Sequence, residues 1–117
     1  MHRSNRQSLR SLLPHYAPNR IRPVEQILDQ WQLHALDGQT IGYGLERIRI
    51  RGLKTPKSTE SGGQEAIERL SQLLREGPIR IVPHGKDVFD RTIADVFVNG
   101  ENVVSLLKAE QPVGANR

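Results

Sequence analysis

Short runs of alternating apolar and polar residues, separated by turn signals, occupy the chain after residue 30. Residues 31–36 alternate loosely, the pair Asp37-Gly38 follows, and residues 40–43 form a second short run. Two such runs joined by this kind of pair are typical of a β-hairpin. We therefore expect the first two strands of a sheet in this part of the chain.

A stricter alternation follows in residues 47–51. Successive side chains of a strand point to opposite faces, so Ile48 and Ile50 share one face. The other face carries three arginines: Arg47, Arg49 and Arg51. The pattern predicts a strand with one face in the core and one in water. Residues 52–63 are rich in Lys, Thr, Ser, Pro and Gly, which predicts a long surface loop.

The only strong helical pattern covers residues 64–76 and ends at Gly77-Pro78. Five apolar residues recur at helical spacing: Ala66, Ile67, Leu70, Leu73 and Leu74. Residues 79–82 and 93–98 then predict two strands, and residues 103–109 a shorter helix. Three strands, a helix, two strands and a helix favour a five-stranded β-barrel with helices, an α+β fold, over a βαβ sheet.

Length and composition limit the class of protein. The chain has 117 residues, of which 36% are apolar, enough for one domain with a modest core. The sequence has no cysteine, which excludes disulfides, zinc ribbons and thiol catalysis. It contains neither the run of about 20 apolar residues that spans a membrane nor an apolar segment typical of a secretory signal. We expect a cytoplasmic protein with no membrane partner.

Positive charge is concentrated at the start of the chain. Five arginines precede the first acidic residue, Glu25: Arg3, Arg6, Arg10, Arg20 and Arg22. The other 12 basic residues are balanced by 13 acidic ones. We therefore divide the chain into a basic flexible arm (1–23), a domain (24–110) and a C-terminal tail (111–117). The arm is compatible with a solvated tail, a phosphate-binding segment or an organelle transit peptide.

Three segments of the chain resemble one known family. They are residues 37–41 (DGQTI), 49–57 (RIRGLKTPK) and 87–100 (DVFDRTIADVFVNG). Their order and spacing are similar to the D-G-D-T, R-L-x-G-I-D-A-P-E and D-x-Y-G-R segments of the staphylococcal nuclease (thermonuclease) family, and the match extends over residues 31–109. The resemblance implies a five-stranded OB-fold of the staphylococcal nuclease type.

In that family, carboxylates bind a calcium ion that helps to activate the attacking water, and two arginines neutralise the phosphodiester. The resemblance assigns the arginine roles to Arg49 and Arg91. The three acidic positions are occupied instead by Gln39, Lys54 and Lys57. Two ammonium groups oppose a divalent cation, and a charged lysine cannot accept a proton as a general base. We therefore expect no catalytic residue, no metal site and no cofactor, with calcium only if the protein is a nuclease after all.

Other side chains could restore a metal site, and we keep that possibility open. Four carboxylates fall in the matching segments or the adjacent loop: Asp37, Asp87, Asp90 and Glu60. Each also has a structural interpretation, as a turn former or an ion-pair partner. The four histidines are scattered and predict structural or solvated roles: His2, His15, His34 and His84.

The cations that remain predict an anion-binding site, although a strand face that simply contacts water is the alternative. The candidate nucleic-acid-binding residues are Arg49, Arg91, Lys54, Lys57, Arg47, Arg51 and Tyr43, with Phe89 as a further stacking residue. Trp31 and Phe97 are expected in the core. The leading hypothesis is an inactive nuclease-like domain that binds nucleic acid, single-stranded DNA or RNA, through its phosphates. The alternatives are a protein–protein interaction module and, less favoured, a metal-dependent phosphodiesterase with a rearranged site.

Overall fold

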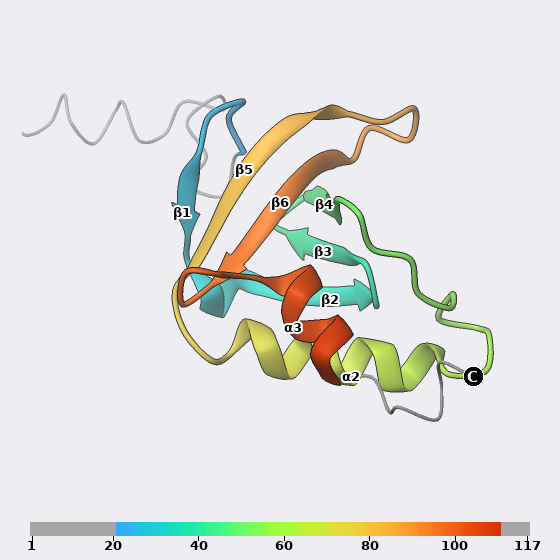
Figure 1. Cartoon of the computed structure of the whole chain (residues 1–117). Helices are drawn as coiled ribbons and strands as arrows, with labels where there is room; N and C mark the ends of the chain where they lie inside the picture. Colours follow the sequence, from blue (N-terminus) through green and yellow to red (C-terminus); the bar gives the residue numbers. More distant parts are fainter. Residues whose placement is uncertain (1–20, 111–117) are drawn as a thin grey trace, which may run out of the picture.

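The computed structural model describes residues 21–110 (Figure 1). The predicted tail and all but three residues of the predicted arm lie outside these described residues. Ile21, which the sequence assigned to the arm, packs against the core, and its backbone N–H donates to Glu46 Oε2 at 3.2 Å. The packed part of the chain therefore includes residue 21.

The described residues form one sheet and two α-helices (Figure 1). The strands are β1 (Gln26–Leu28), β2 (Leu33–Asp37), β3 (Thr40–Tyr43), β4 (Glu46–Ile50), β5 (Ile79–Lys86), β6 (Thr92–Val98) and β7 (Glu101–Asn102). The helices are the short 3-10 helix η1 (Gln30–Gln32), α2 (Gly63–Leu74) and α3 (Val103–Glu110).

The strands follow the order β1-β5-β6-β4-β3-β2, and β7 pairs with β6. Only β4 and β6 pair in parallel. The first and last strands in this order, β1 and β2, are separated by residues 29–32 alone, so the sheet has to curl back toward its own start. The result is a curled half-barrel with helices α2 and α3 against it, consistent with an OB-like α+β fold (Figure 1).

The core lies inside this curl. Along β6 every second residue is buried, from Thr92 to Val98, as expected of a strand with one face in the core. On β4 the buried residues are Ile48 and Ile50, as the sequence predicted. Helix α2 adds Leu70, Leu73 and Leu74 to the same cluster. The arginine face of β4 is therefore the outer face of the barrel.

The boundaries differ from expectation in a few places. Residues 31 and 32 lie in η1, which begins where the Asp29 carboxylate accepts the Trp31 backbone N–H at 3.0 Å. Strand β5 runs to Lys86, four residues beyond its predicted end. Strands β1 and β7 were not predicted, because two or three residues are too few to show a period. Residues 52–62 form the predicted loop, and no helix within residues 21–110 could span a membrane.

Candidate functional site

Arg49 lies in the middle of the curl's outer surface. Its strand neighbours in register are Thr40 on β3 and Ile93 on β6. The residue is half-buried, and among residues 21–108 we find no hydrogen bond or ion pair to its guanidinium. A cation held on a rigid central strand without an acidic partner is available to an external anion.

Arg91 follows the turn between β5 and β6 and is held by Asp87. The Asp87 carboxylate accepts the Arg91 Nε–H at 2.8 Å, the Arg91 backbone N–H at 3.0 Å and the Phe89 backbone N–H at 2.9 Å. Burial raises the pKa of Asp87, but these hydrogen bonds and the Arg91 charge outweigh it, so the pKa lies below its ordinary value. Asp87 thus positions Arg91 and neutralises part of its charge.

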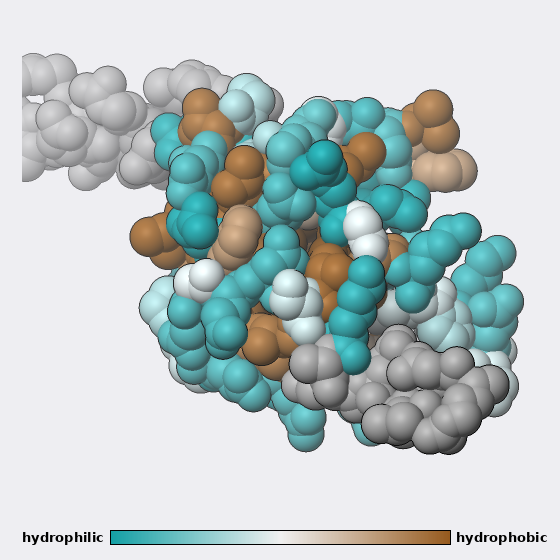
Figure 2. Space-filling model, in the orientation of Figure 1, coloured by the Kyte–Doolittle hydropathy of each residue, from teal (hydrophilic) through white to brown (hydrophobic). Residues whose placement is uncertain are grey.

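Arg47 connects β4 to the same turn. Its guanidinium donates to the carbonyl oxygen of Phe89, and the Arg91 guanidinium lies 5.2 Å from the centre of the Phe89 ring. Phe89 remains 64% exposed and Val88 93% exposed. Figure 2 shows the corresponding apolar surface at the far end of the β5–β6 hairpin. This hairpin end therefore combines two arginines with an exposed aromatic ring.

Gln39 forms hydrogen bonds inside the protein. Its side-chain Oε1 accepts the Thr55 backbone N–H at 3.1 Å, and its own backbone contacts Asp37 and Ile50. These contacts hold the β2–β3 turn against the segment that contains Lys54. The Gln39 side-chain oxygen is thus already a hydrogen-bond acceptor for the protein itself.

Lys54 and Lys57 are exposed. The backbone N–H of Lys57 donates to Glu60 Oε1 at 2.7 Å, which orders the start of the loop. Within the described residues, no hydrogen bond or ion pair engages either ammonium group. Both lysines therefore add positive charge to the loop that follows β4.

Arg51, by contrast, is paired. Its Nη1 lies 3.3 Å from Asp95 Oδ2, and His84 Nε2 lies 2.8 Å from the same oxygen. The sequence placed Arg51 on one strand face with Arg47 and Arg49, but β4 ends at Ile50, one residue before Arg51. Asp95 on β6 compensates the charge of Arg51. Nothing local in the sequence signals this pair, since the partners are 44 residues apart.

Two aromatic residues, Tyr43 and Trp31, lie in environments opposite to those that the sequence predicted. Tyr43 is only 5% exposed and belongs to the core, and burial raises the pKa of its hydroxyl, so its ring does not face solvent as base stacking requires. Trp31, expected in the core, is 73% exposed. Phe97 is half-buried beneath the Arg80 guanidinium, 4.2 Å from its ring centre. Phe89 is the aromatic residue that lies beside the arginines.

The four carboxylates considered for a relocated metal site already have partners. Asp37 accepts the Gln39 backbone N–H at 2.8 Å, Glu60 accepts that of Lys57, and Asp90 pairs with Lys86 at 3.2 Å. Asp87 holds Arg91. In the part of the chain that is described, no three histidine or carboxylate side chains gather as metal ligands do.

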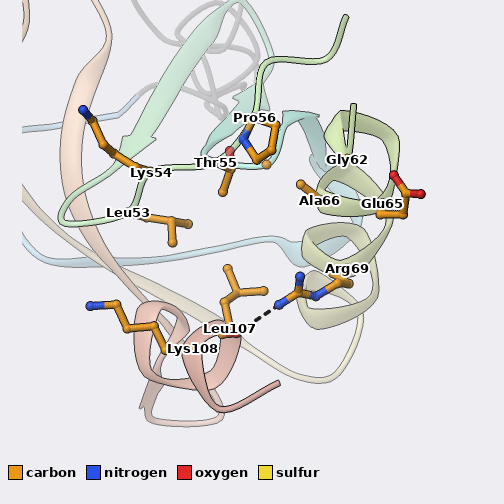
Figure 3. A pocket seen from close by; sticks show the side chains of 11 residues that line it. Leu53, Lys54, Thr55, Pro56, Gly62, Glu65, Ala66, Arg69, Leu107 and Lys108 are labelled. Atoms are coloured by element: carbon orange, nitrogen blue, oxygen red, sulfur yellow. Dashed lines mark hydrogen bonds between the residues drawn. The ribbon is translucent and has the colours of Figure 1, made fainter. Parts of the chain in front are cut away.

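A cavity of about 380 Å³ lies beside Lys54, on the side toward the helices (Figure 3). Its lining comes from the β2–β3 turn, residues 53–56, the first turns of α2 and the end of α3. Sequence reasoning missed this cavity, because four separate segments contribute to it and none carries a recognisable motif.

The chain is similar to proteins named as nucleases. It is 28% identical over 72 residues to a Haemophilus influenzae protein named "Uncharacterized endonuclease", covering 57% of this chain and 40% of that protein. It is 30% identical over 54 residues to a rice (Oryza sativa subsp. japonica) protein named "Probable staphylococcal-like nuclease CAN1", covering 46% of this chain and 16% of that protein. A "38.1 kDa protein" of Capnoides sempervirens is 33% identical over 55 residues, 47% of this chain and 16% of that protein.

No protein-family model matches the chain. The chain spans less than half the length of each of these three relatives. Together with the curled sheet, the two nuclease names support a nuclease-like family and a nuclease-type scaffold.

Proposed function

We propose that this protein is a nuclease-type OB-fold domain that binds the phosphate backbone of single-stranded nucleic acid without cleaving it. The main support for this proposal is the position of Arg49. It is a half-buried cation on the central strand β4 and has no acidic partner among residues 21–108. The nuclease names of two relatives support a nuclease-type scaffold and nucleic acid as the substrate class. The barrel that we propose is the five-stranded OB-fold of the staphylococcal nuclease type.

The phosphate path follows one surface. Arg47 and Arg49 project from the outer face of β4, and Arg91 immediately precedes β6, the strand paired with β4. Lys54 and Lys57 lie in the loop that follows the C-terminal end of β4. We call these five residues the cation strip. Basic grooves with a neighbouring aromatic ring suit single strands, because bases can stack while phosphates are neutralised.

The same residues argue against metal-dependent cleavage. Lys54 and Lys57 stand where the family places carboxylates, and each contact between a cation and a lysine at about 4 Å is unfavourable by about 1 to 4 kcal/mol. Gln39 offers one neutral oxygen that already accepts a hydrogen bond. No proton acceptor for the attacking water remains among the matched positions.

The test is fluorescence anisotropy of a labelled single strand with the full chain, followed over time with calcium and separately with chelator. We expect a stable rise in both, which weakens as salt increases. Arg49→Ala should weaken binding about three- to tenfold and lower the salt dependence by roughly one phosphate contact. Arg75→Ala, a cation at the far end of α2, is the matched control and should change neither.

Each alternative has its own result. A signal that rises and then decays only with calcium identifies a metal-dependent phosphodiesterase and overturns the claim of inactivity. No rise under either condition removes nucleic acid as the ligand and leaves the protein–protein interaction module. Equal losses for Arg49→Ala and Arg75→Ala would show non-specific attraction rather than a site on the cation strip.

A further inference from the structure

The cavity beside Lys54 has a partly apolar lining. Figure 3 shows Leu53 and Leu107 facing each other across it, with Pro56 and Ala66 on the side of α2. All four side chains are aliphatic, and none of the residues that line this cavity is aromatic. Such a lining accommodates aliphatic side chains, but it offers a nucleic-acid base no ring on which to stack.

The rim of the cavity is positively charged. Lys54 and Lys108 come from two different segments, and Glu65 is the one carboxylate among the described residues that line the cavity. In Figure 3 the Arg69 side chain reaches from α2 toward α3, where its Nη2 donates to the Leu107 carbonyl oxygen at 2.9 Å. This bond fixes the separation of the two helices at the cavity and helps to preform it.

Size supports an occupant larger than an ion. A volume of about 380 Å³ is within the range of pockets that hold organic ligands, and it exceeds what a phosphate group needs. Aliphatic walls below a cationic rim are complementary to a chain that presents aliphatic side chains next to carboxylates.

We propose that this cavity is a docking site for an acidic peptide segment of a partner protein, with aliphatic side chains seated between Leu53 and Leu107 and carboxylates on Lys54 and Lys108. This site lies beyond the proposed nucleic-acid function, although both use Lys54. Peptide and nucleic acid therefore compete: each lowers the affinity for the other by the same factor.

The experiment uses the full chain and a short fluorescein-labelled peptide in which leucine alternates with glutamate. Anisotropy should show saturable binding that Lys108→Glu weakens about three- to tenfold, because a rim cation becomes an anion. Glu65→Gln should strengthen binding severalfold, since it removes the repelling carboxylate. Arg75→Glu, outside the cavity, makes the same charge change as Lys108→Glu and is the matched control.

Peptide controls separate the two parts of the recognition. A peptide with serine in place of leucine should bind more than tenfold more weakly, because several buried methylene groups are lost. A peptide with lysine in place of glutamate should not bind. Backbone amide resonances of Ala66 and Leu107 should shift on titration with the leucine peptide, whereas those of the β5–β6 hairpin should not.

Several results would overturn the docking site: no binding, equal binding of the serine peptide, or equal effects of Lys108→Glu and Arg75→Glu. Shifts of Ala66 and Leu107 caused by an oligonucleotide would assign the cavity to nucleic acid instead. Lys108→Glu should leave oligonucleotide affinity within about twofold, so a failure here is distinguishable from a failure of the cation strip.

Discussion

Asp87 shows how one carboxylate can organise a turn. Its two carboxylate oxygens accept three N–H groups, one from Phe89 and two from Arg91. The same turn contains Asp90, whose backbone φ of 64° is unusual for a residue other than glycine. The carboxylate therefore holds both the backbone of the turn and the direction of the Arg91 side chain. At this scale the candidate site depends on side chains that position other side chains.

The lowered pKa of Asp87 predicts a pH dependence of stability. A group whose pKa is lower in the folded than in the unfolded state stabilises the fold above the unfolded value of about 3.8 and loses this contribution as pH falls through the folded value. Urea denaturation should therefore give a lower midpoint for Asp87→Asn than for the natural chain at pH 7, and the difference should be smaller at a pH below 3.8. A constant difference at both pH values would contradict this role.

Gly38 is required for a close approach between the β2–β3 turn and α2. A Cβ atom there would lie 2.6 Å from both Ala66 Cβ and Thr55 Oγ1, closer than side chains pack. Gly38→Ala should lower the free energy of unfolding by about 1 to 3 kcal/mol, as overpacked cores do. Chemical denaturation measures this, with the exposed loop change Ser61→Ala as control; a cost below about 0.5 kcal/mol would mean that the turn relaxes freely.

Among the elements, β6 is central because it pairs with β4, β5 and β7. The long antiparallel pairing of β5 with β6 continues into the hairpin that carries Phe89 and Arg91. Strand β4 pairs with β6 on its other side and carries Arg49. The cation strip therefore rests on the most extensively paired part of the sheet, which limits the movement of its arginines.

The different burial of Ile81 and Ile27 predicts that the same substitution lowers the free energy of unfolding by very different amounts at the two positions. Ile81 is fully buried on β5, whereas Ile27 on the neighbouring strand β1 is 72% exposed. Ile81→Ala should cost about 2 to 5 kcal/mol, through lost burial and a cavity. Ile27→Ala should cost about 0.5 kcal/mol or less, as surface changes usually do. Similar values from denaturant titration would mean that β1 packs more deeply than described.

For the whole molecule, charge distribution determines how binding responds to salt. Residues 1–20 contain four arginines, and the rest of the chain is close to neutral. If these arginines contact phosphates, replacing all four by glutamine in the full chain should reduce the slope of log affinity against log salt, by about 0.7 for each lost contact. An unchanged slope would show that the arginines of residues 1–20 do not contact phosphates and that the cation strip alone binds the nucleic acid.

The sequence predicted the elements with a clear period. The alternation of Ile48 and Ile50 predicted β4, and the apolar stripe of residues 64–76 predicted α2 to within two residues at its end. Tyr43 was misplaced because every residue of β3 is buried. The His34 side chain covers Gly42 on the outer face of β3. Outward-facing residues of β3 are therefore buried as well, and the sequence pattern of this strand does not distinguish its two faces.

The sequence alone establishes which chemical groups the chain carries, among them Arg49, Arg91, Gln39, Lys54 and Lys57. Only the tertiary structure decided which cations keep their charge uncompensated. Arg51 meets Asp95, whereas Arg49 has no such partner among the described residues. The cavity beside Lys54 likewise exists only after folding. The physical reason is shared: ion pairing and enclosure depend on distances between residues far apart in the chain, and local patterns do not encode those distances.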